Sequence, residues 1–191
     1  MNTPKRKLRY FSYYLLAIAT VFLALFLIFD RYHIIINTTE SYPIALYQKK
    51  VIDRAIQRGD SVMFCLPKGN HAELILARGY LPRGSCDSGL KPLLKRVYAV
   101  AGDEVSVDTH GVSVNRADVI KNSIPIREDT QGRALPLMES GIIPAEHYAV
   151  FSAYHPRSFD SRYFGAIHRD NMAYFVEPLW VLGGIYQARS R

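Results

Sequence analysis

The chain has 191 residues and a formal net charge of +7, with 24 Lys and Arg against 17 Asp and Glu. This length fits one membrane segment plus one globular domain with a single core, and it argues against two full soluble domains. Four of the basic residues lie between Lys5 and Arg9, before a long apolar run, where positive charge acts as a topology signal. No later basic block is interleaved with aromatic residues, so the sequence does not favour nucleic-acid binding.

The first predicted element is a membrane anchor over residues 11–29, a run without a charged side chain. Its length approaches the ~20 residues that cross a bilayer as a helix. A cleaved secretory signal needs small residues at its exit, whereas this run ends in Leu27-Ile28-Phe29 and is followed by Asp30-Arg31. We therefore expect an uncleaved anchor, a cytoplasmic basic tail over residues 1–10 and an extracytoplasmic domain over residues 30–191.

Short apolar runs separated by turn signals predict a mainly β domain after the anchor. Residues 32–36 either lie at the membrane surface or begin the first strand. The further strands are expected within residues 61–66, 93–100, 104–107, 112–114, 147–152, 172–176 and 179–182. Residues 71–80 have the spacing of a short helix that ends at Gly79, and the polar residues 123–141 predict an excursion over the surface.

The two cysteines, Cys65 and Cys86, would face an oxidising compartment, where a disulfide can persist. We expect them to pair, and by chain entropy a loop of this length stabilises the fold by ~3 kcal/mol. No Cys-x-x-Cys motif and no histidine at ligand spacing supports a metal site.

Ser41 is the first candidate for chemistry, because it stands before Tyr42-Pro43 on a turn that proline keeps out of the helical conformation. Such a turn can display a hydroxyl, although Ser and Pro are also ordinary turn residues. The sequence has no Gly-x-Ser-x-Gly elbow, no His-Glu-x-x-His and no phosphate-binding loop. Its six histidines are scattered, so a Ser/His mechanism has no support.

Lys95 is the second candidate, because it stands within the apolar run 93–100. A buried lysine loses its charge as its pKa falls, and its neutral amine can then take a proton from a serine hydroxyl. Two alternatives stay open: strand alternation turns Lys95 outward and Arg96 inward, or Lys91 is the functional lysine.

The third candidate is the segment 155–165, in which Asp160 and Arg162 stand two positions apart. In an extended segment they share a face with Ser158 and can form a buried ion pair. A polar loop with a surface ion pair is the alternative.

Together these stretches resemble the sequence boxes of the type I signal peptidase family, S26. The matching stretches are Ser41-Tyr42-Pro43, Lys95-Arg96-Val97 with Ala101-Gly102-Asp103, Ser158-x-Asp160-Ser161-Arg162-Tyr163-x-Gly165, and Gly59-Asp60-Ser61-Val62. They occur in the family's order, and the 54 positions between serine and lysine are similar to the family's gap. The resemblance implies a signal-peptidase-like β-barrel or β-sheet domain with serine endopeptidase activity.

Within the family the chain is most similar to the conjugative-transfer peptidases of the TraF type. It shares their Asn-Thr-Thr-x-Ser-x-Pro stretch, the two cysteines and the short His-Pro-Arg-Ser-Phe-Asp segment. The housekeeping enzymes have methionine after the serine and a longer Gly-Asp-Asn segment. Tyr42 and His155-Pro156 depart from that pattern, which favours a dedicated substrate such as a pilin precursor.

The resemblance implies a role for each matching position. Ser41 is the expected nucleophile and Lys95 the general base, and Thr39 supplies an oxyanion-hole hydroxyl beside the Ser41 backbone N–H. Ser158 is expected to hydrogen-bond and orient the Lys95 amine, with Asp160 and Arg162 as a supporting salt bridge.

The implied setting is the inner (cytoplasmic) membrane, with one span, a cytoplasmic N-terminus and a periplasmic catalytic domain. The implied partners are a pilin or other secreted precursor, membrane lipid and the conjugative secretion machinery, without nucleic acid, cofactor or metal. Two other hypotheses remain: a housekeeping signal peptidase that cleaves many preproteins, and a non-catalytic β module of pilus or secretion assembly.

Overall fold

The computed structural model describes residues 4–181, with side chains from residue 9 onward. The chain divides into two units, one up to Ile35 and one from Ile36 onward, and each is described by itself. The predicted end of the last strand, Leu182, and the basic residues Arg189 and Arg191 lie outside the described residues.

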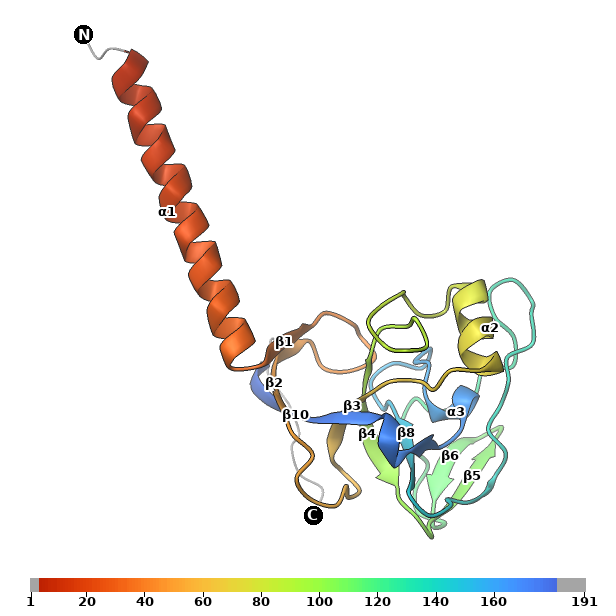
Figure 1. Cartoon of the computed structure of the whole chain (residues 1–191). Coiled ribbons are helices and arrows are strands. Elements are labelled where there is room, and N and C mark those ends of the chain that lie inside the picture. Colours follow the sequence, from red (N-terminus) through yellow and green to blue (C-terminus); the bar gives the residue numbers. More distant parts are fainter. Residues whose placement is uncertain (1–3, 182–191) are drawn as a thin grey trace. The chain divides into compact units, whose positions relative to one another are not determined.

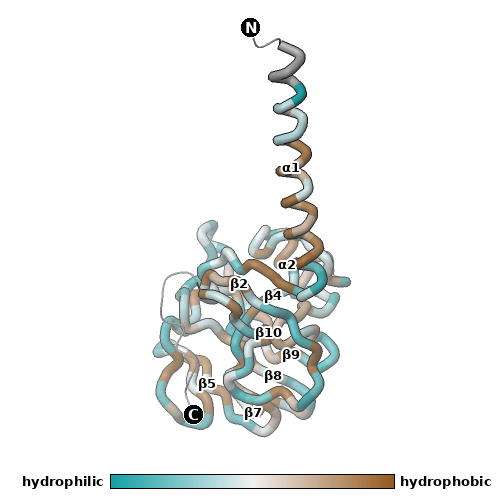
Figure 2. Tube along the Cα trace, turned by 90° about the vertical axis from the view of Figure 1, so that its left-hand side faces the viewer, coloured by the Kyte–Doolittle hydropathy of each residue, from teal (hydrophilic) through white to brown (hydrophobic). Residues whose placement is uncertain are grey.

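The first unit is dominated by helix α1, Pro4–Arg31, which contains the predicted anchor. Its apolar part, Arg9–Arg31, is 23 residues long, and at 1.5 Å per residue it spans about 35 Å, enough for the ~30 Å core of a bilayer. Figure 2 shows the hydrophobic stretch along this helix. The helix ends where His33 takes a φ of 52°, and the chain continues as strand β1, Ile34–Asn37. By length and composition, this helix fits a single-pass membrane anchor.

The second unit is built on a large sheet (Figure 1). After β1, its strands are β2 (Ala45–Lys50), β3 (Ser61–Phe64), β4 (Leu93–Ala99), β8 (His147–Phe151), β9 (Ile167–His168) and β10 (Met172–Val181). The order across the sheet is β1-β2-β10-β3-β4-β8-β9. The pairs that β10 makes with β2 and β3, that β4 makes with β3 and β8, and that β8 makes with β9 are antiparallel. Both β10 and β4 are therefore interior strands.

A smaller sheet of three strands has the order β6-β5-β7. These are β5 (Glu104–Asp108), β6 (Gly111–Val114) and β7 (Gly141–Ile142), and β5 and β6 form the predicted hairpin. The Asp108 carboxylate accepts the His110 N–H at 2.7 Å and so closes the turn. Val105 and Val112 are fully buried and form a second core cluster with Ala99 and Phe151 of the large sheet.

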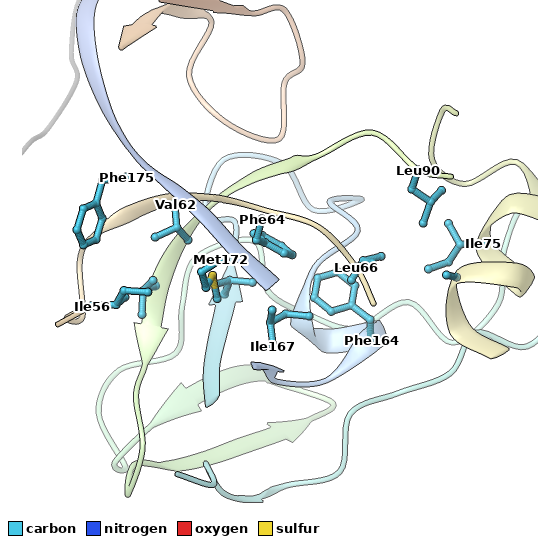
Figure 3. Packing of buried hydrophobic residues seen from close by; sticks show 13 residues of the cluster. Ile56, Val62, Phe64, Leu66, Ile75, Leu90, Phe164, Ile167, Met172 and Phe175 are labelled. Atoms are coloured by element: carbon cyan, nitrogen blue, oxygen red, sulfur yellow. The ribbon is translucent and has the colours of Figure 1, made fainter. Parts of the chain in front are cut away.

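The main core lies between the large sheet, helix α2 (Asn70–Arg78) and helix α3 (Ser161–Phe164), and Figure 3 shows its side chains. α2 contributes Ala72 and Ile75, and it ends at Gly79, whose φ of 69° favours glycine. Cys65, directly after β3, is disulfide-bonded to Cys86. The helix prediction and the mainly β fold class are therefore confirmed.

Two local predictions are wrong. Residues 172–176 and 179 onward belong to one strand, β10, with a register shift between Pro178 and Trp180 where proline offers no N–H to the ladder. The segment after Asp160 is not extended, because residues 161–164 form α3. Asp160, which is itself extended, is the N-cap of this helix and accepts the Arg162 N–H at 3.2 Å. A 3-10 turn, Arg169–Asn171, precedes β10.

Candidate active site

Ser41 lies on the connection between β1 and β2, in a turn that is fixed largely by side chains. The Asn37 carboxamide nitrogen donates to the carbonyl oxygens of Thr39, Tyr42 and Pro43 at 3.0, 2.8 and 3.0 Å. Its oxygen accepts the Thr39 N–H at 3.2 Å and the Thr39 hydroxyl at 2.8 Å. One asparagine therefore organises the main chain on both sides of Ser41.

Tyr42 attaches this turn to the large sheet. Its ring is buried, and its hydroxyl makes a short hydrogen bond with the hydroxyl of Ser61 at the start of β3. The next residue of β3, Val62, is the antiparallel partner of Lys95 on β4. The residue after the candidate nucleophile is thus anchored beside the strand pair that carries the candidate base.

Lys95 points inward, which decides between the alternatives that the sequence left open. It is 2% exposed and shares the buried face of β4 with Val97 and Ala99, whereas Arg96 is half-buried and Lys91 is exposed. Its amine donates to Ser41 Oγ at 2.9 Å, across 54 positions of sequence. The pairing of β3 with β4 therefore places the Lys95 amine within hydrogen-bond distance of the Ser41 hydroxyl.

The surroundings of Lys95 favour the neutral amine. Burial lowers the pKa of Lys95 from 10.5 to about 8, the nearby Asp160 carboxylate opposes this effect, and the Arg162 guanidinium adds to it. A substantial fraction of the amine is thus neutral at mildly alkaline pH, where it can accept a proton from the Ser41 hydroxyl that it contacts.

Thr39, for which the resemblance implies an oxyanion-hole role, lies beside Ser41, with its hydroxyl 3.3 Å from Ser41 Oγ. The backbone N–H of Ser41 makes no hydrogen bond within residues 4–181, so it is available to an oxyanion. The Ser41 N–H is thus one donor next to the hydroxyl that would attack a carbonyl. The Thr39 hydroxyl donates its proton to Asn37 Oδ1 in this structure and becomes a second donor when it turns toward the oxyanion.

Asp160 and Arg162 form a fully buried ion pair beside Lys95. Arg162 Nε donates to Asp160 Oδ1 at 2.7 Å and Nη2 donates to Oδ2 at 2.8 Å, with both side chains 0% exposed. The remaining guanidinium donors reach the carbonyl oxygens of Asn122, Ile124, Pro156 and Ser158. This pair therefore holds two loops together, as well as adding opposing charges near the amine.

Ser158 does not make the predicted hydrogen bond to the Lys95 amine. Its side chain is buried, and within the described part of the chain its hydroxyl has no hydrogen-bond partner. Its main chain is held by the loop instead, because its N–H donates to His155 at 3.1 Å and its carbonyl accepts Arg162 at 3.0 Å. Ser158 is thus close to the ion pair in sequence, but the Lys95 amine donates to Ser41 and not to Ser158.

The arrangement suits acyl transfer. A serine hydroxyl contacts a buried amine, and the Ser41 N–H and the Thr39 hydroxyl lie next to that hydroxyl. No group of three or more His, Cys, Asp or Glu side chains able to hold a metal ion occurs among residues 4–181. Asn37 and the bond between Tyr42 and Ser61 were not predicted as parts of the site, although Asn37 begins the Asn-Thr-Thr-x-Ser-x-Pro stretch.

Comparison with known families and proteins gives a consistent result. A family model described as signal peptidase, peptidase S26, matches residues 7–180. A "Probable conjugal transfer protein TraF" of Sinorhizobium fredii is 40% identical over 133 residues, which make up 69% of this chain and 69% of the relative. A "Plasmid transfer protein TraF" of Escherichia coli is 34% identical over 146 residues, 75% of this chain and 81% of the relative.

Two further matches have lower identity. A "Conjugal transfer protein TraF" of Agrobacterium tumefaciens is 31% identical over 145 residues, 76% of this chain and 81% of the relative. Among solved structures, a signal peptidase I from Enterococcus faecalis matches with a TM-score of 0.36 and 16% identity. That match covers 64% of this chain and 97% of the other.

Proposed function

Because the chain belongs to the signal peptidase family, peptidase S26, and is a serine peptidase of that type, we propose that Ser41 and Lys95 form its catalytic pair. The observation that carries the proposal is the 2.9 Å contact between Lys95 Nζ and Ser41 Oγ, made by an amine that is 2% exposed. Burial provides the neutral base, and the contact provides the path for the proton.

The proposed reaction has two steps. Ser41 Oγ attacks the scissile carbonyl while Lys95 takes the hydroxyl proton, and the Ser41 N–H and the Thr39 hydroxyl stabilise the oxyanion. Lys95 then protonates the leaving amine, which yields an acyl-enzyme. In the second step Lys95 takes a proton from the attacking water, the ester bond to Ser41 breaks, and the proton returns to Ser41 Oγ.

The proposed substrate is a precursor protein that is delivered to the outer face of the same membrane. The relatives' names refer to conjugal and plasmid transfer, which supports a pilin or other secreted precursor of a conjugative system. The basic residues before α1 favour a cytoplasmic N-terminus, an inner-membrane anchor over residues 11–29 and a periplasmic domain from residue 30.

The test is co-expression of the full chain with a candidate pilin precursor, followed by intact-mass measurement of the product. Ser41→Ala and Lys95→Ala should each leave the precursor intact, while Lys91→Ala, which changes an exposed lysine of the same region, should process it as the wild type does. Processing by Ser41→Ala at the wild-type rate would overturn the proposal.

The same experiment separates two fates of the acyl-enzyme. Attack by water gives a linear product, whereas attack by an amine of the pilin itself gives a ring that is lighter by one water. Cleavage of many unrelated preproteins in the same cells would instead assign the chain to housekeeping secretion.

A further inference from the structure

A buried serine just after β8 holds the main chain of the nucleophile. Ser152 is 1% exposed, and its hydroxyl donates to the carbonyl oxygen of Ser41 at 2.6 Å, across 111 positions of sequence. The same hydroxyl accepts the N–H of Tyr154 at 3.2 Å, which fixes the direction in which its proton points.

Ser152 is itself fixed by the buried ion pair. Its N–H donates to Asp160 Oδ2 at 3.1 Å, the same oxygen that accepts Arg162 Nη2 at 2.8 Å. A continuous set of hydrogen bonds therefore runs from the carbonyl of Ser41 through Ser152 to the Asp160–Arg162 pair. The carboxylate at the end of this set is also the one that influences the charge of Lys95.

The Ser41 carbonyl is held by Ser152 and not by Asn37. Asn37 binds the carbonyls of Thr39, Tyr42 and Pro43 but not that of Ser41. The orientation of this carbonyl fixes the ψ torsion of Ser41 and so helps to fix the backbone from which its side chain projects. Loss of the Ser152 hydroxyl would therefore loosen the residue whose Oγ must stay in line with the Lys95 amine.

We propose that Ser152 is a positioning residue that holds the Ser41 hydroxyl in line with the Lys95 amine by tying the Ser41 carbonyl to the Asp160–Arg162 pair. The inference rests on the proposed function, in which Ser41 is the nucleophile. Ser152 touches no reacting atom, and its effect passes through the backbone of Ser41.

The test uses p-nitrophenyl acetate as a small acyl donor, because it does not depend on recognition of a precursor. Ser41 Oγ attacks the ester carbonyl, p-nitrophenolate leaves, and the hydroxyl proton passes to Lys95. The rate of acetylation is followed by the mass of the peptide that contains Ser41, in the full chain in detergent micelles. Ser152→Ala should lower this rate about tenfold to a hundredfold.

Ser123→Ala is the matched control. Ser123 is likewise 1% exposed, donates its hydroxyl to a carbonyl, that of Ile120, at 2.6 Å, and accepts a backbone N–H, that of Val112, at 2.8 Å. The two variants delete the same kind of buried hydrogen bond, so thermal unfolding should show a similar loss of stability in both. Only Ser152→Ala should slow acetylation.

The pH dependence gives a readout that a general loosening of the domain would not reproduce. In the wild type the rate should rise with pH with a midpoint near the Lys95 pKa of about 8. Ser152→Ala should lower the plateau and leave the midpoint in place. An unchanged plateau, or an equal loss in Ser123→Ala, would overturn the inference while leaving the proposed function intact. Absence of acetylation at Ser41 in the wild type would overturn the proposed function itself.

Discussion

The two partners of the proposed catalytic pair are held in opposite ways. Lys95 stands on β4, an interior strand that is hydrogen-bonded to β3 on one side and β8 on the other, and its side chain is buried. Ser41 stands on a turn outside the strands, between the exposed Glu40 and the buried Tyr42. Its main chain depends on the side chains of Asn37 and Ser152.

The difference predicts how each side responds to substitution. A strand in the middle of a sheet keeps its position through many backbone hydrogen bonds, so replacing one side chain leaves the position of Lys95 unchanged. A turn held by single side chains moves when one of them is removed. Substitution of Lys95 should therefore change the base and the buried charge without moving the strand. Substitutions in the turn should instead change the position of Ser41.

Lys95→Met should have the largest effect, because it removes the base and keeps the shape of the strand. We expect processing to fall by about 10²–10⁴-fold, the usual contribution of a general base. At the same time, the free energy of unfolding at pH 7 should rise by up to about 3 kcal/mol, since burial holds the pKa of Lys95 near 8 instead of 10.5. Precursor processing and denaturant unfolding measure the two effects.

The pH dependence of unfolding checks the same assignment. At pH values below 8 the folded and unfolded chains both carry the proton on Lys95, so the cost of its buried charge is fully present. Between pH 8 and 10.5 only the unfolded chain retains the proton, so this residue makes the wild type more stable as pH rises. The difference between wild type and Lys95→Met should shrink across this interval. A constant difference would show that the amine carries no buried charge at neutral pH.

Thr39→Val, a substitution in the turn that carries Ser41, should have the next largest effect on the rate. The substitution keeps the shape of the side chain but removes a hydroxyl that lies 3.3 Å from Ser41 Oγ. Loss of one oxyanion donor typically lowers the rate by about 10²-fold, and Thr39→Ser should restore most of it.

Thr38→Val serves as the control for this effect, because Thr38 is the exposed neighbour. Both valine variants should bind the precursor with an unchanged KM, and only Thr39→Val should lower kcat. Equal rates in the two would place the oxyanion donor elsewhere.

The same contrast explains how much of the site could be predicted from the sequence. Lys95 was recognisable because a charged residue inside an apolar run is unusual, and the strand period then limited it to two orientations. Which of the two applies depends on the pairing of β4 with β3 and β8, and pairing between distant strands is not encoded in a local pattern. The motif around Ser41 was recognisable through resemblance.

The side chain that holds the Ser41 carbonyl could not be predicted from the sequence. Ser152 and Ser41 are 111 positions apart, and a serine at the end of a predicted strand carries no signal of its partner. For Ser158 the resemblance implied a hydrogen bond to the Lys95 amine, and the structure does not contain that bond. The sequence predicted an extended segment around Asp160, because a helix of only four residues, such as α3, is too short to leave a helical pattern in the sequence.

The smallest effect on catalysis is expected for the disulfide, which belongs to neither side of the comparison. It joins Cys65, directly after β3, to Cys86 in the connection before β4, and so closes the segment that contains α2. Replacing both cysteines by serine should lower the free energy of unfolding by ~3 kcal/mol, because the unfolded chain gains entropy. Below the melting temperature processing should stay at the wild-type rate, since the pairing of Val62 with Lys95 is made by the strands themselves. Reduction of the wild type should reproduce both results. A loss of processing without a loss of stability would mean that the position of Lys95 depends on this covalent link as well as on the sheet.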